Sequence, residues 1–206
     1  RAARTITTCA KSGAAGEPAG GAVVGDSERG AKLRAELAVV LDGGELLGVP
    51  GLAAAVRLAH RQQMVADRDG IRFVNDSKAT NADAAAKALV CYDPIYWIIG
   101  GQPKEGGLDG LEPFMPRIRH AFLIGQATEQ FAAWLDRHGV AYTRCGTLEA
   151  AVPAAAAMAR DEVLPGATVL LSPACASWDQ FRSFEHRGEV FAALVNDFLV
   201  KKEIAG

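Results

Sequence analysis

From Met64 to the C-terminus, short apolar runs alternate with longer stretches in which apolar residues recur every three or four positions. Short runs of this kind are typical of buried strands, and the longer periodic stretches are typical of amphipathic helices. The expected strands are 71–74, 95–99, 121–124 and 169–171, and the expected helices are 82–91, 127–138, 147–162 and 185–202. This alternation predicts an α/β fold with a mostly parallel sheet and helices on both faces.

One pair of strands is expected to be antiparallel. The runs 64–67 and 71–74 are separated only by Arg68-Asp69-Gly70, a spacing that indicates a hairpin. This hairpin would lead directly into the first central strand.

The first sixty residues follow a different pattern. Residues 1–30 are rich in Ala, Gly, Ser and Thr and have no sustained apolar period, which predicts a loop or a loosely ordered tail. Two short helices, 31–41 and 51–60, fit the apolar positions that follow. We therefore expect residues 1–61 to be a short helical and irregular stub that precedes a domain at 62–206.

Composition excludes several classes of function. Half of the 206 residues are hydrophobic and 22% are charged, which is enough to build a sizeable core. A net charge of −2 provides no basic field for nucleic acid or an anionic membrane, and no apolar run approaches the roughly 18 residues of a membrane span. We therefore expect neither nucleic-acid binding nor membrane insertion.

The four cysteines are widely spaced, at positions 9, 91, 145 and 175, with no C-x-x-C pair and no nearby histidine cluster. This spacing favours buried, reduced thiols in a cytoplasmic protein over a zinc site or a disulfide framework. We expect no metal site in this chain.

Polar residues and glycines follow three of the expected strands. They are Asn75-Asp76-Ser77-Lys78, Gly100-Gly101-Gln102-Pro103-Lys104 and Ser172-Pro173-Ala174. In open α/β sheets, ligands bind beyond the carboxyl ends of the strands. The convergence of lysines, hydroxyls and glycines at these ends predicts a ligand site there.

The segment after the first central strand combines a helix start with a cation. Thr80 and Asp83 match a capping box for the helix 82–91, which would account for the Thr80 hydroxyl. Capping does not explain Lys78, because the positive end of a helix dipole disfavours a cation. An anionic ligand bound at the same helix end would explain it.

The other two strand ends allow both a structural and a functional interpretation. Gly100–Gly107 does not match G-x-G-x-x-G and could be a simple turn, although Lys104 within it could bind a second carboxylate. Ser177 with Gln180 forms another capping-box pattern, and a helix beginning there would offer N–H groups to an anion. Cys175 has no candidate base beside it, so we do not assign it as a nucleophile.

Longer strings around these positions resemble a known family. The strings are Asn75-Asp76-Ser77-Lys78-Ala79-Thr80-Asn81 and Leu171-Ser172-Pro173-Ala174-Cys175-Ala176-Ser177, continued by Asp179-Gln180-Phe181 and Phe184-Glu185-x-Arg187-Gly188. In them the chain resembles the Mur ligases, and among these the UDP-N-acetylmuramoyl-L-alanine:D-glutamate ligases of peptidoglycan synthesis. The resemblance runs from about Leu58 to the C-terminus and includes His60-Arg61.

The resemblance implies an enzyme of three domains: one for the UDP-sugar peptide, a central ATPase and a C-terminal Rossmann-like domain. Residues 62–206 would be the third domain, and residues 1–61 a remnant of the second or an unmatched region. In the family, ATP with Mg²⁺ phosphorylates the carboxylate of UDP-N-acetylmuramoyl-L-alanine, and the amine of D-glutamate attacks the acyl phosphate. The resemblance further implies a cytoplasmic protein, and we expect a monomer.

The family's functional positions map onto seven residues of this chain. The resemblance implies that D-glutamate is bound by Lys78, Thr80, Lys104, Ser177 and, through its backbone, Phe184. It implies that Arg61 and Asp76 lie on the ATP side.

The chain also departs from the family. It contains no G-x-x-x-x-G-K-[ST] phosphate loop and no counterpart of the central domain's metal ligands. Gln102 stands where some members carry an acid, and residues 1–45 do not match. The expected catalytic residues are therefore absent from this chain. The alternatives are a non-catalytic α/β binding module derived from the domain and a Mur-type ligase that adds another amino acid.

Overall fold

Six strands form one sheet within residues 59–205, the part of the chain that the computed structural model describes. Their order across the sheet is β1-β2-β6-β3-β4-β5. The strands are β1 (Gln63–Arg68), β2 (Ile71–Asn75), β3 (Ile95–Gly100), β4 (Ile118–Ile124), β5 (Tyr142–Gly146) and β6 (Thr168–Leu171). β1 pairs antiparallel with β2, and every other pairing is parallel. The predicted α/β fold and the predicted hairpin are both confirmed.

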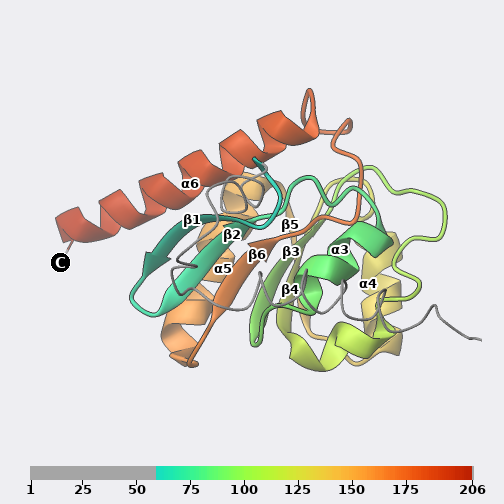
Figure 1. Cartoon of the computed structure of the whole chain (residues 1–206), viewed down its shortest axis with the longest axis horizontal. Coiled ribbons are helices and arrows are strands. Elements are labelled where there is room, and N and C mark those ends of the chain that lie inside the picture. Colours follow the sequence, from blue (N-terminus) through green and yellow to red (C-terminus); the bar gives the residue numbers. More distant parts are fainter. Residues whose placement is uncertain (1–58, 206) are drawn as a thin grey trace, which may run out of the picture. The chain divides into compact units, whose positions relative to one another are not determined.

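The central strands are apolar because both of their sides are covered. Every residue of β3 and β6 is buried, as expected for parallel strands enclosed between two layers of helices. One hydrophobic cluster joins the sheet to α3 (Ala82–Leu89), the 3₁₀ helix η1 (Glu112–Arg117) and α4 (Thr128–Arg137). A second cluster joins the opposite face to α5 (Leu148–Glu162) and α6 (Phe184–Ala205), and Figure 1 shows this three-layer arrangement.

Two elements were not predicted from the sequence. β5 lies at the edge of the sheet and is mostly exposed, so its sequence Tyr-Thr-Arg-Cys-Gly lacks the apolar character of the central strands. η1 contains two prolines, which obscure any helical pattern. The expected helix 31–41 lies outside the described residues. So does the expected helix 51–60, except for Ala59 and His60, which form a turn.

Cysteines 91, 145 and 175 are free thiols, of which only Cys175 is fully buried, and Cys9 lies outside the described residues. Within residues 59–205 no group of three or more His, Cys, Asp or Glu side chains could hold a metal ion. In that same part of the chain, no helix has the length and apolar character needed to cross a membrane.

Candidate ligand site at the carboxyl ends of the strands

The three polar segments follow strands that are neighbours in the sheet. β6 lies between β2 and β3, with Leu171 aligned with Asn75 on one side and with Ile98 on the other. Because these strands are parallel, the segments that follow them emerge at the same edge of the sheet, as Figure 1 shows. The predicted convergence of segments 75–78, 100–104 and 172–174 is therefore observed.

The segments after β3 and β6 are hydrogen-bonded to each other. The Gln102 N–H donates to the Ala176 carbonyl at 2.9 Å, and the Ala176 N–H donates to the Gln102 carbonyl at 3.1 Å. Gly101 makes this approach possible, because a Cβ there would lie 2.4 Å from the Ala176 carbonyl oxygen. This bridge fixes the segment that carries Ser177 against the one that carries Lys104.

Lys104 and Thr80 meet across two of the segments. The Lys104 ammonium donates to the Thr80 hydroxyl oxygen at 3.4 Å. Beside them lies a pocket of about 600 Å³ between the start of α3 and the glycine-rich loop. Its lining residues are Asn81, Ala82, Asp83, Lys104, Glu105, Gly106, Gly107 and Asp109. A cation and a hydroxyl at the edge of this pocket can bind a small carboxylate, although three of the lining residues, Asp83, Glu105 and Asp109, are acidic.

The predicted helix cap at Thr80 is wrong. The N-cap of α3 is Asn81, whose side-chain oxygen accepts a hydrogen bond from the Ala84 N–H at 2.8 Å. The backbone at Asn81 is extended, as an N-cap requires, and Asn ranks above Thr at this position. The Thr80 hydroxyl is thus used by Lys104 and not by the helix.

Lys78 lies against the beginning of α6. Its ammonium is 5.7 Å from the centre of the Phe184 ring, within range of a cation–π contact. The Phe184 carbonyl in turn accepts a hydrogen bond from the Ser77 hydroxyl at 2.8 Å. Two of the predicted residues, Lys78 and Phe184, are therefore neighbours although they are distant in sequence.

Ser177 is buried, but the helix predicted to begin there is absent. Its carbonyl accepts from the Gln180 and Phe181 N–H groups in a single turn, and α6 begins only at Phe184. The side chains of this turn bond to other loops: Asp179 accepts from the Gln126 N–H at 3.0 Å, and Gln180 donates to the Gly146 carbonyl at 2.8 Å. These tertiary bonds replace the helical continuation that the local pattern predicted.

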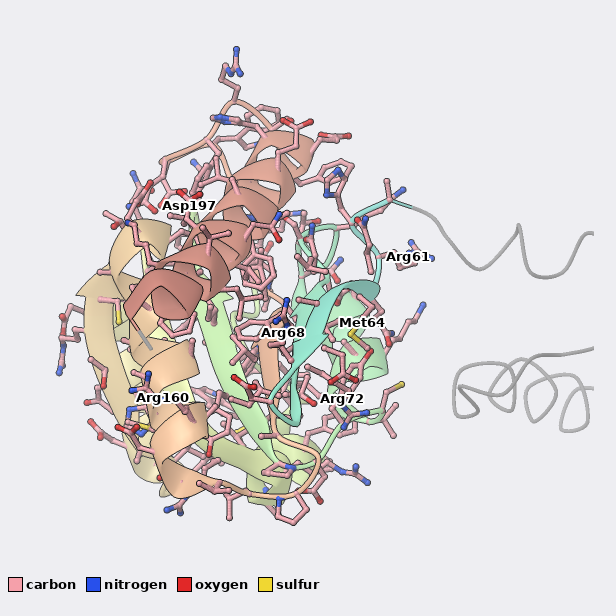
Figure 2. All side chains as sticks on the ribbon, turned by 90° about the vertical axis from the view of Figure 1, so that its left-hand side faces the viewer. Arg61, Met64, Arg68, Arg72, Arg160 and Asp197 are labelled. Atoms are coloured by element: carbon pink, nitrogen blue, oxygen red, sulfur yellow. The ribbon has the colours of Figure 1, made fainter. Side chains whose placement is uncertain are left out.

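Arg61 and Asp76 form a second group near the end of β2. Figure 2 shows Arg61 at the surface, where the chain enters β1. The Asp76 carboxylate accepts hydrogen bonds from the Ser172 hydroxyl at 2.8 Å and the Gln62 N–H at 3.2 Å. Burial raises the pKa of Asp76 to about 6, and those two hydrogen bonds together with the Arg61 charge only partly oppose the shift.

Among the described residues, this region supplies cations for an anion, but its Cys175 thiol is not an activated nucleophile. Burial raises the pKa of the Cys175 thiol to about 12, so this thiol stays protonated at neutral pH. The chemistry available at this edge is the binding and orientation of a small anionic ligand.

Arg187 is a buried residue of the site region that sequence reasoning noted only as part of a matching string. It lies on α6, four residues before the buried Phe191 and eight before the buried Val195. An arginine on the apolar stripe of an amphipathic helix was the signal that could have identified it.

The geometry defines an α/β domain with a candidate site for a small anion at the carboxyl edge of its sheet, and comparison with known proteins shows which proteins it is similar to. No protein-family model matches the chain. The UDP-N-acetylmuramoylalanine–D-glutamate ligase of Paramagnetospirillum magneticum is 63% identical over 147 residues, which are 71% of this chain and 32% of that protein. The enzymes of the same name from Rhodospirillum rubrum and Rhizobium meliloti are 59% and 52% identical, over 72% and 80% of this chain and 31% and 35% of theirs.

These matches confirm the resemblance: the chain is homologous to part of the D-glutamate-adding Mur ligases. It spans about a third of the length of these relatives. A solved structure of the UDP-N-acetylmuramate–alanine ligase MurC from Thermotoga maritima aligns with a TM-score of 0.45 and 12% identity, over 72% of this chain and 31% of that one.

Proposed function

We propose that residues 62–206 are the C-terminal, D-glutamate-binding domain of the ligase that joins D-glutamate to UDP-N-acetylmuramoyl-L-alanine. Residues 1–61 would be a remnant of the central ATPase domain or an unmatched region. The observation that carries the proposal is the contact between Lys104 and Thr80 beside a pocket of about 600 Å³, in a chain that is 63% identical to one such ligase over 147 residues. In this proposal the complete enzyme acts as a monomer in the cytoplasm.

The role of the domain is to hold D-glutamate so that only its amine can react. D-Glutamate carries two carboxylates, and each needs its own charged partner. Lys104 with Thr80 would bind one carboxylate, and Lys78 with Ser177 and the Phe184 backbone would bind the other. The free amine would then attack the acyl phosphate of the other substrate, and collapse of the tetrahedral intermediate would release phosphate and leave an amide.

ATP and Mg²⁺ would activate the acceptor carboxylate in the complete enzyme. Arg61 fits the nucleotide side, because its guanidinium is exposed and lies close enough to Asp76 to lower the pKa of that carboxyl. Within residues 59–205, no group of three His, Cys, Asp or Glu side chains is placed so that it could bind Mg²⁺. In this proposal the phosphoryl-transfer machinery belongs to the rest of the enzyme, because the sequence contains no G-x-x-x-x-G-K-[ST] phosphate loop.

Calorimetric titration of the 206-residue protein with D-glutamate tests the proposal, with L-glutamate as the stereochemical control. Lys104→Ala and Lys78→Ala should each weaken D-glutamate binding roughly tenfold to hundredfold, because losing a charge-assisted hydrogen bond costs about 1.5–3 kcal/mol. Lys87→Ala is the matched control, since Lys87 is an exposed lysine in the last turn of α3.

Equal affinity for D-glutamate in wild type and both lysine variants, with cooperative unfolding retained, would place the site elsewhere. Preferential binding of another amino acid would instead favour a related Mur-type ligase.

A further inference from the structure

The Arg187 side chain is fully buried in the first turn of α6. Its Nε donates to the Ser77 hydroxyl at 2.9 Å, and one terminal nitrogen, Nη2, donates to the Ser77 carbonyl at 2.8 Å. The other, Nη1, donates to the Cys175 carbonyl at 3.1 Å. One guanidinium therefore joins the segment after β2 to the segment after β6.

The same group also lies against the third segment of the site. A Cβ built on Gly101 would be 3.3 Å from Arg187 Nη1, so the guanidinium packs beside the backbone at the end of β3. Ser77 precedes Lys78, Cys175 lies two residues before Ser177, and Gly101 begins the loop that carries Lys104. All three segments that carry the proposed D-glutamate contacts thus meet at Arg187.

A buried charge is not an efficient way to stabilise a fold, because removing it from water costs free energy. In the described part of the chain, no carboxylate forms an ion pair with Arg187, and its acceptors are two carbonyls and a hydroxyl. Burial lowers the pKa of the guanidinium to about 10, and the Asp179 charge partly opposes this shift, so the group stays charged at neutral pH. An apolar residue of similar volume would avoid the desolvation penalty, but it could not hold two segments in a fixed relation.

We propose that Arg187 is a positioning residue that fixes the spacing between the Lys78 and Ser177 segments, and so the geometry of the group that would bind one carboxylate of D-glutamate. The planar fork is essential to this role, because separate nitrogens must reach Ser77 and Cys175 at the same time. The identity of the ligand in this inference rests on the proposed function. The coupling between the segments rests only on the hydrogen bonds of Arg187.

Arg187→Lys tests the role, because it keeps the charge and most of the volume but removes the fork. Amide hydrogen exchange of the 206-residue protein, followed by NMR, should become at least tenfold faster at Ala176 and Ser177 and at Ala79 and Thr80. Amides of β3 and β4 should remain unchanged. Affinity for D-glutamate should fall at least tenfold. Arg144→Lys is the matched control, since Arg144 forms an exposed bidentate pair with Glu129.

Ser77→Ala provides a second variant if Arg187→Lys does not fold. It removes the hydroxyl that accepts from Arg187, and it should accelerate exchange at Ala176 and Ser177, about 100 residues away. The proposal would be overturned if amide exchange stayed unchanged at Ala79 and Thr80 or at Ala176 and Ser177. It would also be overturned if exchange became equally faster in β3 and β4. The wild-type protein could fail to bind D-glutamate while the variants still show faster exchange in both segments. That result would support the positioning role and refute the proposed function.

Discussion

Asp76 is a buried carboxylate whose neighbours influence its pKa in opposite directions. Loss of hydration raises the pKa, whereas the Ser172 hydroxyl, the Gln62 N–H and the Arg61 charge lower it. The raised value of about 6 indicates that burial is the larger effect. Because the folded pKa lies above the unfolded value of 3.8, protonation favours the folded state.

The stabilisation from Asp76 should therefore be complete below about pH 4 and lost as the pH rises through about 6. Between these limits, the stability of wild type relative to Asp76→Asn should change by about 2–3 kcal/mol, with wild type gaining as the pH falls. Urea unfolding of both proteins from pH 4 to pH 8 measures this difference. Carboxylates common to both proteins cancel, so a difference that does not vary with pH would contradict the assignment.

Gly101 allows the backbone contact between the segments after β3 and β6. Gly101→Ala should destabilise the protein by about 1–3 kcal/mol more than Gly106→Ala, because only the first places a methyl group against a carbonyl oxygen. Both glycines have positive φ, 129° and 83°, so the strain of a side chain in that conformation is present in both variants. Chemical denaturation gives the two free energies of unfolding, and equal values would mean that the Gln102–Ala176 bridge is readily displaced.

At the start of α3, two adjacent residues have different roles: Asn81 caps the helix, and Thr80 is proposed to bind the ligand. Asn81→Ala should lower the free energy of unfolding by about 1 kcal/mol, because it removes the helix cap. Thr80→Ala should leave stability nearly unchanged and weaken D-glutamate binding, since its hydroxyl contacts Lys104. Thermal or urea unfolding with calorimetric titration distinguishes the two variants. A larger loss of stability in Thr80→Ala would restore the original capping assignment.

The elements that sequence patterns predict are those whose apolar positions face the core. The hairpin and the four expected central strands are all present, because burial on one or both faces imposes an apolar pattern. β5 was missed because an exposed edge strand has no such requirement. The capping boxes at Thr80 and Ser177 were wrong because other residues form the decisive contacts: Asn81 at α3, and loop-to-loop bonds from Asp179 and Gln180.

The candidate site was predictable to the extent that parallel strands place their ends together. Lys104 and Thr80 come from different strand ends, and their meeting follows from the sheet. The local pattern of α6 marks Arg187 as a buried arginine but does not give its contacts, because its partners Ser77 and Cys175 lie 110 and 12 residues away. Long-range hydrogen bonds of this kind depend on the assembled fold.

For the molecule as a whole, the buried residues of the two hydrophobic clusters lie between Ile71 and Val195. Helices that begin within this range cover both faces of the sheet, as expected of a domain that folds without residues 1–45. Deleting residues 1–45 should therefore leave a single cooperative unfolding transition. Circular dichroism during heating measures this transition, and its loss in the truncated protein would show that the domain begins earlier than residue 62.

The 206-residue protein alone should not form the amide bond. It spans about a third of the length of its curated relatives, and its sequence contains no G-x-x-x-x-G-K-[ST] loop to hold ATP phosphates. Binding and orienting D-glutamate cannot replace activation of the acceptor carboxylate, which needs a phosphoryl donor held in place. Purified protein with ATP, Mg²⁺, D-glutamate and UDP-N-acetylmuramoyl-L-alanine should therefore release no ADP above background in a coupled assay. A D-glutamate-binding signal from the same preparation is the control for a folded site. ADP release that requires both substrates and disappears in Lys104→Ala would show that this chain carries the full activity.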